Sequence, residues 1–413
     1  MKNPRVLWLL GYLLVNIIGY FIMASTGFLI GDVDGVPVYN YNSLFFAAIT
    51  TIFFYYLLMG PCFNFITKIK TRRVAFNICD NKLSDRISLF LMAAQLCFFC
   101  FNVSQGVNVA GAGNHKAQGP FSFLWVLLPV DALFLIYYSI YRNSRYFTSN
   151  FLIWLASNLY RGWAGVFLFI LFFEFCRLFR ERKLSFIKSM LILFFTLLLY
   201  PIINVLKWTI RGFAGGEFDF FLLLGAVTDY ISLDEYLSLV SDGFNHLVGR
   251  VQTTSMLVEV MRLQPVLSKA FENSNFIPFW KEGIIGIAYD TLIYGVKGIP
   301  LNVIFPMYAN LGSIDDLGNW NTNTGFASWL LIAPLWSPIY IFYVLALCFI
   351  SSFLMKKLSS SSSAMDGLWF AWLMYLLPPW FGAFIGYIQA LFIFYILTYI
   401  LGKIPSFRFQ LSS

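Results

Sequence analysis

Long apolar runs constrain the fold of this chain more than any other feature of its sequence. A helix needs about 20 apolar residues to cross the hydrocarbon core of a bilayer, and only helices or closed barrels satisfy their backbone there. The runs and the length of 413 residues therefore predict an all-α polytopic integral membrane protein with roughly 10–12 transmembrane helices. The runs cover residues 6–30, 43–66, 87–107, 121–141, 150–177, 186–208, 326–355, 367–384 and 385–402.

The composition also favours a bilayer over a soluble core. Charged residues make up 12% of the chain, whereas an ordinary soluble domain has about 25%. Neither an internal repeat nor a separate soluble domain is visible. We therefore expect one membrane domain in three parts. These are N-terminal transmembrane helices over 1–208, a large and partly helical outer loop over 209–325, and C-terminal transmembrane helices over 326–413.

The basic residues predict the orientation of the chain. They gather in the connection 67–86, after residue 141, over 177–183, after residue 355 and near both ends. The positive-inside rule places such clusters in the cytoplasm, and one topology satisfies all of them. Both termini then lie inside the cell. Segment 209–325 lies outside and carries twelve acidic residues and six basic ones, the reverse of the inner connections.

The run 150–177 is interrupted by NLYRGWAG at 158–165 and has basic flanks on both sides. It is too short for two full crossings, so we expect two tight or re-entrant helices that meet at Arg161–Gly162. An arginine facing lipid would cost about 3 kcal/mol or more. Two interpretations of Arg161 stay open. It is either a turn residue whose side chain reaches the membrane surface or, as we favour, an inward-facing ligand for an anion.

Segment 235–263 repeats its apolar residues close to the helical period, which predicts an amphipathic helix. Asp242, His246 and Arg250 recur every fourth residue, so they share one stripe of that helix. The stripe is either an ordinary solvated face or a catalytic one. In the catalytic interpretation Asp242 orients His246, which takes a proton from a hydroxyl, and Arg250 binds a phosphate. Glu259 is an alternative base.

Most catalytic motifs are missing from the sequence. It has no P-loop, HExxH, GxSxG or GxGxxG in a βαβ context, and only two histidines. The pair in GDVD at 31–34 lies in a glycine-rich turn, where aspartate is ordinary. We expect no metal ion, no cofactor and no nucleic-acid partner. Arginine is the side chain best suited to phosphate, so Arg161, Arg211 and Arg250 around one cavity would bind a diphosphate.

The number of spans, the single large outer loop late in the chain and three arginine motifs resemble Wzy-type O-antigen polymerases. These motifs are LYRGWAG at 159–165, IRGFAGGEF at 210–218 and HLVGRVQTT at 246–254. Some family members have glycine about ten residues after an outer-loop arginine. Here Gly225 follows Arg211 at fourteen residues, and Arg250 has no such glycine.

The resemblance covers nearly the whole chain as architecture and implies a GT-C-like membrane glycosyltransferase in the bacterial inner membrane. Such an enzyme joins oligosaccharide repeat units linked to undecaprenyl diphosphate, as donor and acceptor, by metal-independent inverting transfer. Its active site faces the periplasm, and a chain-length regulator protein is an implied partner. Two alternatives stay open, a flippase for lipid-linked oligosaccharides and an O-antigen ligase. The large outer segment argues against the flippase, whereas only the choice of acceptor separates ligase from polymerase.

Overall fold

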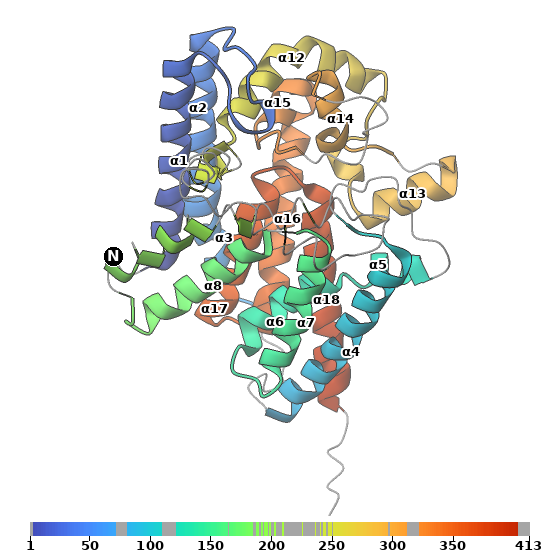
Figure 1. Ribbon diagram of the computed structural model, residues 1–413. Helices are drawn as coiled ribbons and strands as arrows, with labels where there is room; N and C mark the ends of the chain where they lie inside the picture. The colour runs from blue at the N-terminus through green and yellow to red at the C-terminus, as the bar shows by residue number, and fades with distance from the viewer. Residues whose placement is uncertain are drawn as a thin grey trace, which may run out of the picture.

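The computed structural model describes residues 3–71, 81–109, 121–163, 165–184, 251–295, 298–311 and 322–403, and isolated residues between 187 and 249. These residues are nearly all helical, and no β-strand occurs among them (Figure 1). The all-α prediction is therefore confirmed for the described part of the chain.

Six helical segments in the described ranges are long and apolar enough to cross a membrane. They support a polytopic membrane protein and coincide with six of the predicted runs. The prediction of a span over 186–208 lies largely outside the described residues. Three of the six segments are single helices: α1 (Pro4–Thr26), α4 (Asn81–Gln105) and α18 (Phe381–Lys403). Two segments join two helices each: α2 and α3 (Tyr41–Leu57, Phe63–Lys68), and α5 and α6 (Phe121–Leu127, Val130–Tyr141). The sixth segment, Pro334–Leu358, contains α16 (Ser337–Leu358).

The interrupted run forms two short helices joined by a tight turn, as predicted. Helix α7 (Phe147–Tyr160) and helix α8 (Gly165–Arg180) meet at Arg161 and Gly162. Gly162 has a φ of +67°, which lets the chain leave α7 in a tight turn. At 1.5 Å per residue the two helices extend about 21 and 24 Å, short of the roughly 30 Å of a hydrocarbon core.

The predicted span over 367–384 is wrong in its bounds. Helix α17 (Ser362–Ala371) continues through a π-helical turn (Trp372–Leu376) and ends before Pro378 and Pro379. Proline lacks the backbone N–H and clashes with the preceding turn, so two consecutive prolines break the helix. Helix α18 then starts at Phe381 rather than at residue 385. The result is one short helix followed by one full-length helix.

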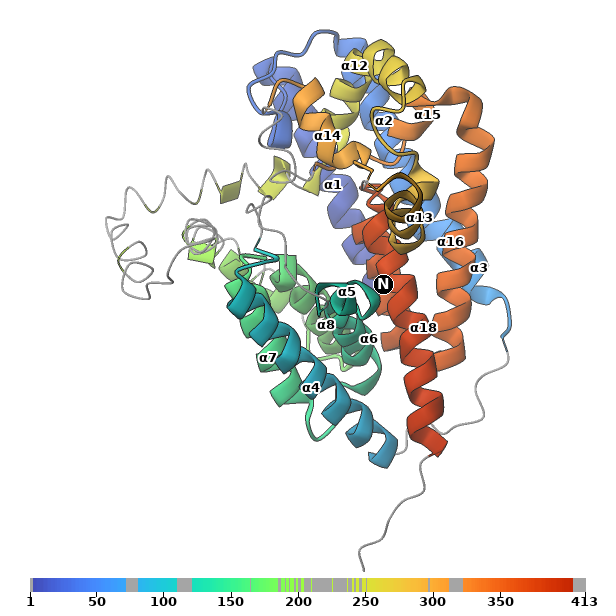
Figure 2. The same cartoon turned by 90° about the vertical axis from the view of Figure 1, so that its right-hand side faces the viewer.

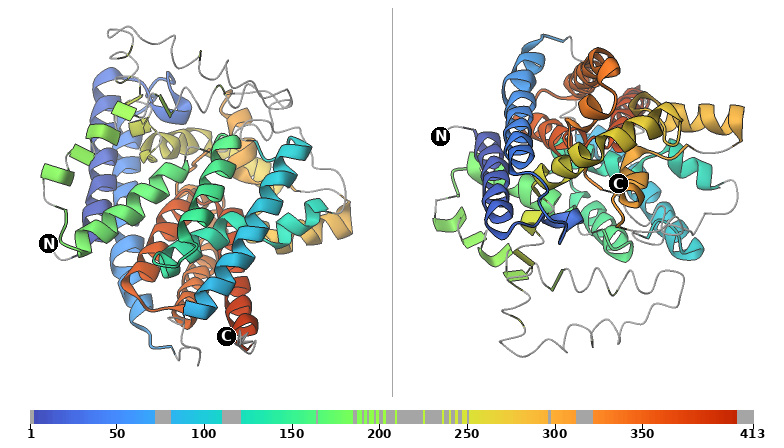
Figure 3. Two further views of the ribbon diagram at one scale, coloured as in Figure 1. Left: turned by 60° about the horizontal axis from the view of Figure 1, so that its bottom comes forward. Right: turned by 90° about the horizontal axis from the view of Figure 1, so that it is seen from above.

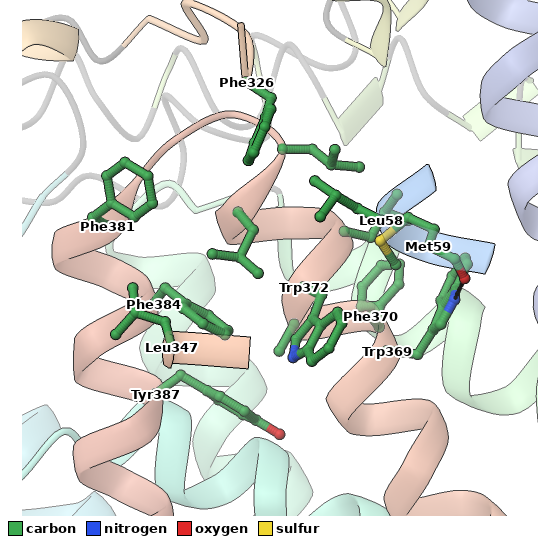
Figure 4. Close-up of a cluster of buried hydrophobic side chains, with 14 of the residues drawn as sticks. Leu58, Met59, Phe326, Leu347, Trp369, Phe370, Trp372, Phe381, Phe384 and Tyr387 are labelled. Carbon is green, nitrogen blue, oxygen red and sulfur yellow. Dashed lines mark hydrogen bonds between the residues drawn. The ribbon is translucent and has the colours of Figure 1, made fainter. Parts of the chain in front are cut away.

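Two π-helical turns meet in the aromatic core shown in Figure 4. The first (Leu58–Cys62) lies between α2 and α3, and the second follows α17. Trp369 Nε1 donates to the Met59 carbonyl at 2.9 Å, and the Trp372 ring lies 5.0 Å from that of Phe63. These contacts satisfy polar groups of the irregular turns inside an apolar cluster, and they lock α17 against α2 and α3.

Basic residues near several helix ends bind groups on other helices. Arg5 of α1 donates to Asp366 of α17 at 2.8 Å, and Arg180 of α8 binds the second oxygen of the same carboxylate. Arg86 of α4 donates to the Leu401 carbonyl near the end of α18. Helix α4 starts and α18 ends on the same side of the molecule (Figure 2), and the predicted orientation of the chain stays a prediction.

The opposite end is covered by helices of the predicted outer segment. Helix α12 (Thr254–Glu272) packs on α2 and α15 (Ser328–Ile332), with α14 (Leu301–Tyr308) beside it (Figure 2). Seen from above, α12 lies across the other helices (Figure 3). Helix α13 (Ile284–Tyr294) extends to one side (Figure 1). This end holds Glu259 of α12, whereas Arg161 lies at the turn between α7 and α8 and contacts α6 instead.

Candidate functional site

Only part of the predicted site lies in the described residues. Arg161 and Glu259 are described, whereas Arg211, Asp242, His246 and Arg250 lie outside. The proposed base, its orienting carboxylate and two of the three predicted diphosphate ligands therefore stay predictions.

The guanidinium of Arg161 is buried at the turn between α7 and α8, with 2% of the residue exposed. Its Nη2 lies 2.9 and 2.8 Å from the two carboxylate oxygens of Asp131, at the start of α6. It also contacts the Asn158 side chain at 3.0 Å, and Nε donates to the Ser157 carbonyl. Arg161 thus faces inward, and the alternative of a side chain reaching the membrane surface is wrong. The anion that it binds here is Asp131, whose side chain is 33% exposed.

Aromatic rings and buried polar groups surround this ion pair. The Arg161 guanidinium lies 5.1 Å from the ring centre of Phe98 and 5.3 Å from that of Trp163, distances typical of cation–π contacts. Gln95 and Asn102 lie on the same face of α4 as Phe98, and all three are buried. Among the described residues, the Gln95 amide and Asn102 Nδ2 have no hydrogen-bond partner. Buried polar groups are usually paired, so this interface holds unused donors and acceptors.

The second described part of the site is the ion pair between Glu259 and Arg262 on α12. The Glu259 side chain is fully buried, and its Oε2 accepts from Arg262 Nε at 2.8 Å while Oε1 accepts from Nη2. The Arg262 side chain is 37% exposed. The hydrogen bonds that Arg262 donates to Glu259 raise the pKa of Arg262, which keeps it charged. Both carboxylate oxygens accept from Arg262, so Glu259 holds Arg262 in place, and its role as a base stays a prediction.

The predicted helix over 235–263 does not run unbroken. The chain leaves the helical conformation at Gln252–Thr253, and α12 continues nine residues beyond the predicted end. Asn16 of α1 causes the break, because its Oδ1 accepts from the Thr253 N–H at 3.1 Å and the Thr254 hydroxyl at 3.3 Å. The side chain of Gln252 caps the new helix by accepting from the Ser255 N–H.

The start of α12 also differs from the predicted amphipathic surface. Residues 254–260 are all buried, so this part of α12 has no solvated face. Just upstream, the backbones of Gly31 and Gly249 touch. A Cβ on Gly249 would lie 2.6 Å from Gly31 Cα, and Gly31 has a φ of +87°. The close approach fixes Gly249 against the loop between α1 and α2.

Sequence reasoning missed two partners that the structure supplies. Asp131 is a single carboxylate within the apolar run 121–141, and such a residue signals a buried ion pair. Arg262 follows Glu259 by three residues, the spacing of neighbours on a helix. Both signals are present in the sequence, but neither shows that the two arginines are held by buried or half-buried carboxylates.

No family model, no curated protein and no solved structure matches this chain. The function is therefore inferred from the residues and contacts above. Within the described ranges, no group of three or more His, Cys, Asp or Glu side chains is placed to hold a metal ion.

A buried carboxyl outside the predicted site gives the folded protein a pH dependence. Glu282 is 5% exposed and accepts from the Gly382 N–H at 3.2 Å, at the start of α18. Burial raises the pKa of Glu282 to about 8, although the N–H groups of Gly382 and Phe381 lower it. The folded state therefore keeps a proton that the unfolded chain releases above about pH 4.3.

We expect wild-type stability to fall as pH rises from about 5 through 8, because the unfolded state binds fewer protons there. A Glu282→Gln variant lacks this titration, so its unfolding temperature should change less over the same range. Thermal unfolding of both purified proteins in one detergent at several pH values measures the difference. If the unfolding temperatures of the two proteins change equally with pH, the pKa of Glu282 is not raised in the folded state.

Proposed function

We propose that this protein is an O-antigen polymerase of the bacterial inner membrane, a metal-independent inverting glycosyltransferase with a GT-C-like architecture. The supporting observation is the placement of Arg161 and Arg262. Each of these arginines is fixed by a carboxylate, Arg161 by Asp131 and Arg262 by Glu259. A guanidinium held in this way is pre-organised for the two phosphates of a polyprenyl-linked donor. The six apolar helices are compatible with a ligand carried by a membrane lipid.

In the proposed reaction the bond between the anomeric carbon of the donor glycan and the diphosphate oxygen breaks. A hydroxyl of the acceptor repeat unit forms the new bond to that carbon from the opposite face. The hydroxyl proton goes to a base, for which His246 oriented by Asp242 is our candidate. The departing diphosphate keeps the bonding electrons, and arginines stabilise its growing negative charge. Arg211 and Arg250 complete the proposed set of diphosphate ligands.

Asp131 has a defined part in this proposal. It neutralises Arg161 in the absence of substrate and is itself one-third exposed. A diphosphate approaching Arg161 therefore displaces Asp131 or shares the guanidinium with it. Because a buried charge needs a partner, Asp131 stabilises the empty site.

The proposal places both termini in the cytoplasm and the active site at the periplasmic face. Donor and acceptor are both undecaprenyl-diphosphate-linked oligosaccharides, and a chain-length regulator is the expected protein partner. A flippase and an O-antigen ligase are the alternatives, and each leaves a different glycan when its gene is lost.

Deletion of the gene followed by gel analysis of the surface glycan tests the proposal. Loss of a polymerase should leave the lipid core with one repeat unit, and a plasmid copy should restore the ladder. Bare core alone would instead indicate a ligase or a flippase. Polymerisation of lipid-linked repeat units by the purified protein should persist with a chelator present. A strict requirement for Mg²⁺ would contradict the metal-independent mechanism.

A further inference from the structure

A groove of about 420 Å³ lies between the second half of α12 and the end of α14. Its volume falls in the range of about 300–1,000 Å³ typical of small-molecule sites. We call it the α12–α14 groove. The lining residues that matter here are Pro265, Val266, Lys269, Asn273, Asn275 and Tyr308.

The groove continues a line of exposed side chains that begins at Arg262. Arg262, Val266, Lys269 and Asn273 recur at three- or four-residue spacing, so they share one face of α12. From residue 262 to residue 273 the helix rises about 16 Å. A polyprenyl-linked glycan has the same order of groups, a diphosphate followed by sugars. If Arg262 binds the diphosphate, the sugars extend along α12 into the groove.

The lining of the groove is mostly apolar and carries several polar groups. The Asn275 side chain donates to the Tyr308 hydroxyl at 3.1 Å, which fixes both groups at the groove. Asn273 and Asn275 each offer amide donors and an acceptor, as adjacent sugar hydroxyls require. Pro265, Val266 and the Tyr308 ring add apolar surface for the C–H face of a sugar ring.

Lys269 adds a positive charge to this lining. It is exposed, and no carboxylate in the described ranges forms a salt bridge with it. Glu272 lies one turn further on α12 but does not line the groove. A cation without a described partner in a sugar-sized groove favours a sugar that carries a carboxylate.

We propose that the α12–α14 groove binds the glycan of the substrate and selects an acidic sugar such as a uronic acid. This inference rests on the proposed glycosyltransferase function and adds the substrate class. The charge of Lys269 selects the acid, whereas the amides and the Tyr308 ring bind sugars of either charge.

Saturation-transfer NMR on the full chain in phosphatidylcholine nanodiscs tests the proposal with three probes. These are digalacturonate, neutral mannobiose and sn-glycerol 3-phosphate, which carries the head-group chemistry of an anionic lipid. Digalacturonate should bind most tightly. Lys269→Gln should weaken digalacturonate binding about threefold, which is the effect of losing one exposed ion pair. The affinity for mannobiose should not change. Tyr308→Phe should weaken both sugars, because Asn275 loses the hydroxyl that fixes it.

Glu272→Gln is the matched control, since it changes an exposed charge on the same helix outside the groove. Unfolding temperatures of all variants check the fold, because Lys269 near the helix end also interacts with the helix dipole. Equal digalacturonate binding by wild type and Lys269→Gln would overturn the proposal, as would tighter binding of glycerol phosphate. The gene deletion can leave bare core while the purified chain still binds digalacturonate as expected. That combination would refute the proposed polymerase function but not the proposed groove site.

Discussion

An Arg161→Ala variant should lose about 3 kcal/mol of stability, because it removes a buried guanidinium and leaves the Asp131 carboxylate with only the hydrogen bond from Asn158. The two cation–π contacts with Phe98 and Trp163 are lost as well. Cells that carry the variant should show no long-chain glycan. Unfolding of the purified protein in graded detergent mixtures measures the first effect, and a glycan gel measures the second.

A double variant separates structural loss from functional loss at this site. Replacing a buried ion pair by apolar residues of similar size is often neutral for stability. Asp131→Leu with Arg161→Met should therefore recover most of the stability lost in Arg161→Ala. If Arg161 binds the diphosphate, the double variant still makes no long chains. A normal glycan ladder from a stable double variant would show that the pair only holds the α7–α8 turn against α6.

An Arg262→Ala variant should lose about 4 kcal/mol at neutral pH, because Glu259 is fully buried and would keep an unpaired charge. Unfolding of wild type and variant in the same detergent measures this loss. Equal stability of the two proteins would mean that the Glu259–Arg262 pair does not stabilise α12.

Arg262→Lys is the matched variant for the functional part of this prediction. Lysine keeps the positive charge but cannot engage both Glu259 oxygens with a planar fork. It should recover part of the stability and little of the long-chain glycan, since diphosphate binding needs a positioned guanidinium. Full activity in Arg262→Lys would show that charge alone is sufficient at this position.

The sequence predicted the membrane helices well because apolar length is a local property. The break at Arg161–Gly162 was also predictable, since a charge and a glycine interrupt an apolar run. The bounds of α17 were not predicted correctly. The apolar run continues through Pro378 and Pro379, so hydropathy hides the end of the helix there. Hydropathy alone cannot distinguish a short helix with an aromatic core contact from a full span.

The site was less predictable because it depends on contacts between distant segments. No local pattern shows that Asn16 binds the backbone of Thr253 or that Arg161 pairs with Asp131. Glu259 was predicted as a base from its residue type alone. The structure gives it a different environment, because Arg262 occupies both of its oxygens.

The contact between α1 and the start of α12 has a consequence for how the chain folds. Asn16 and Thr253 are 237 residues apart, yet they share a buried hydrogen bond, and Gly31 touches Gly249 nearby. Contacts between residues so far apart in sequence form late, because a long stretch of chain must first be closed into a loop. During synthesis, α1 and α2 therefore form before their partner α12 exists. The Asn16 side chain then lacks its Thr253 partner until more than half of the protein has been synthesised. Segment 209–325 expressed alone would lack the surface on which α12 folds.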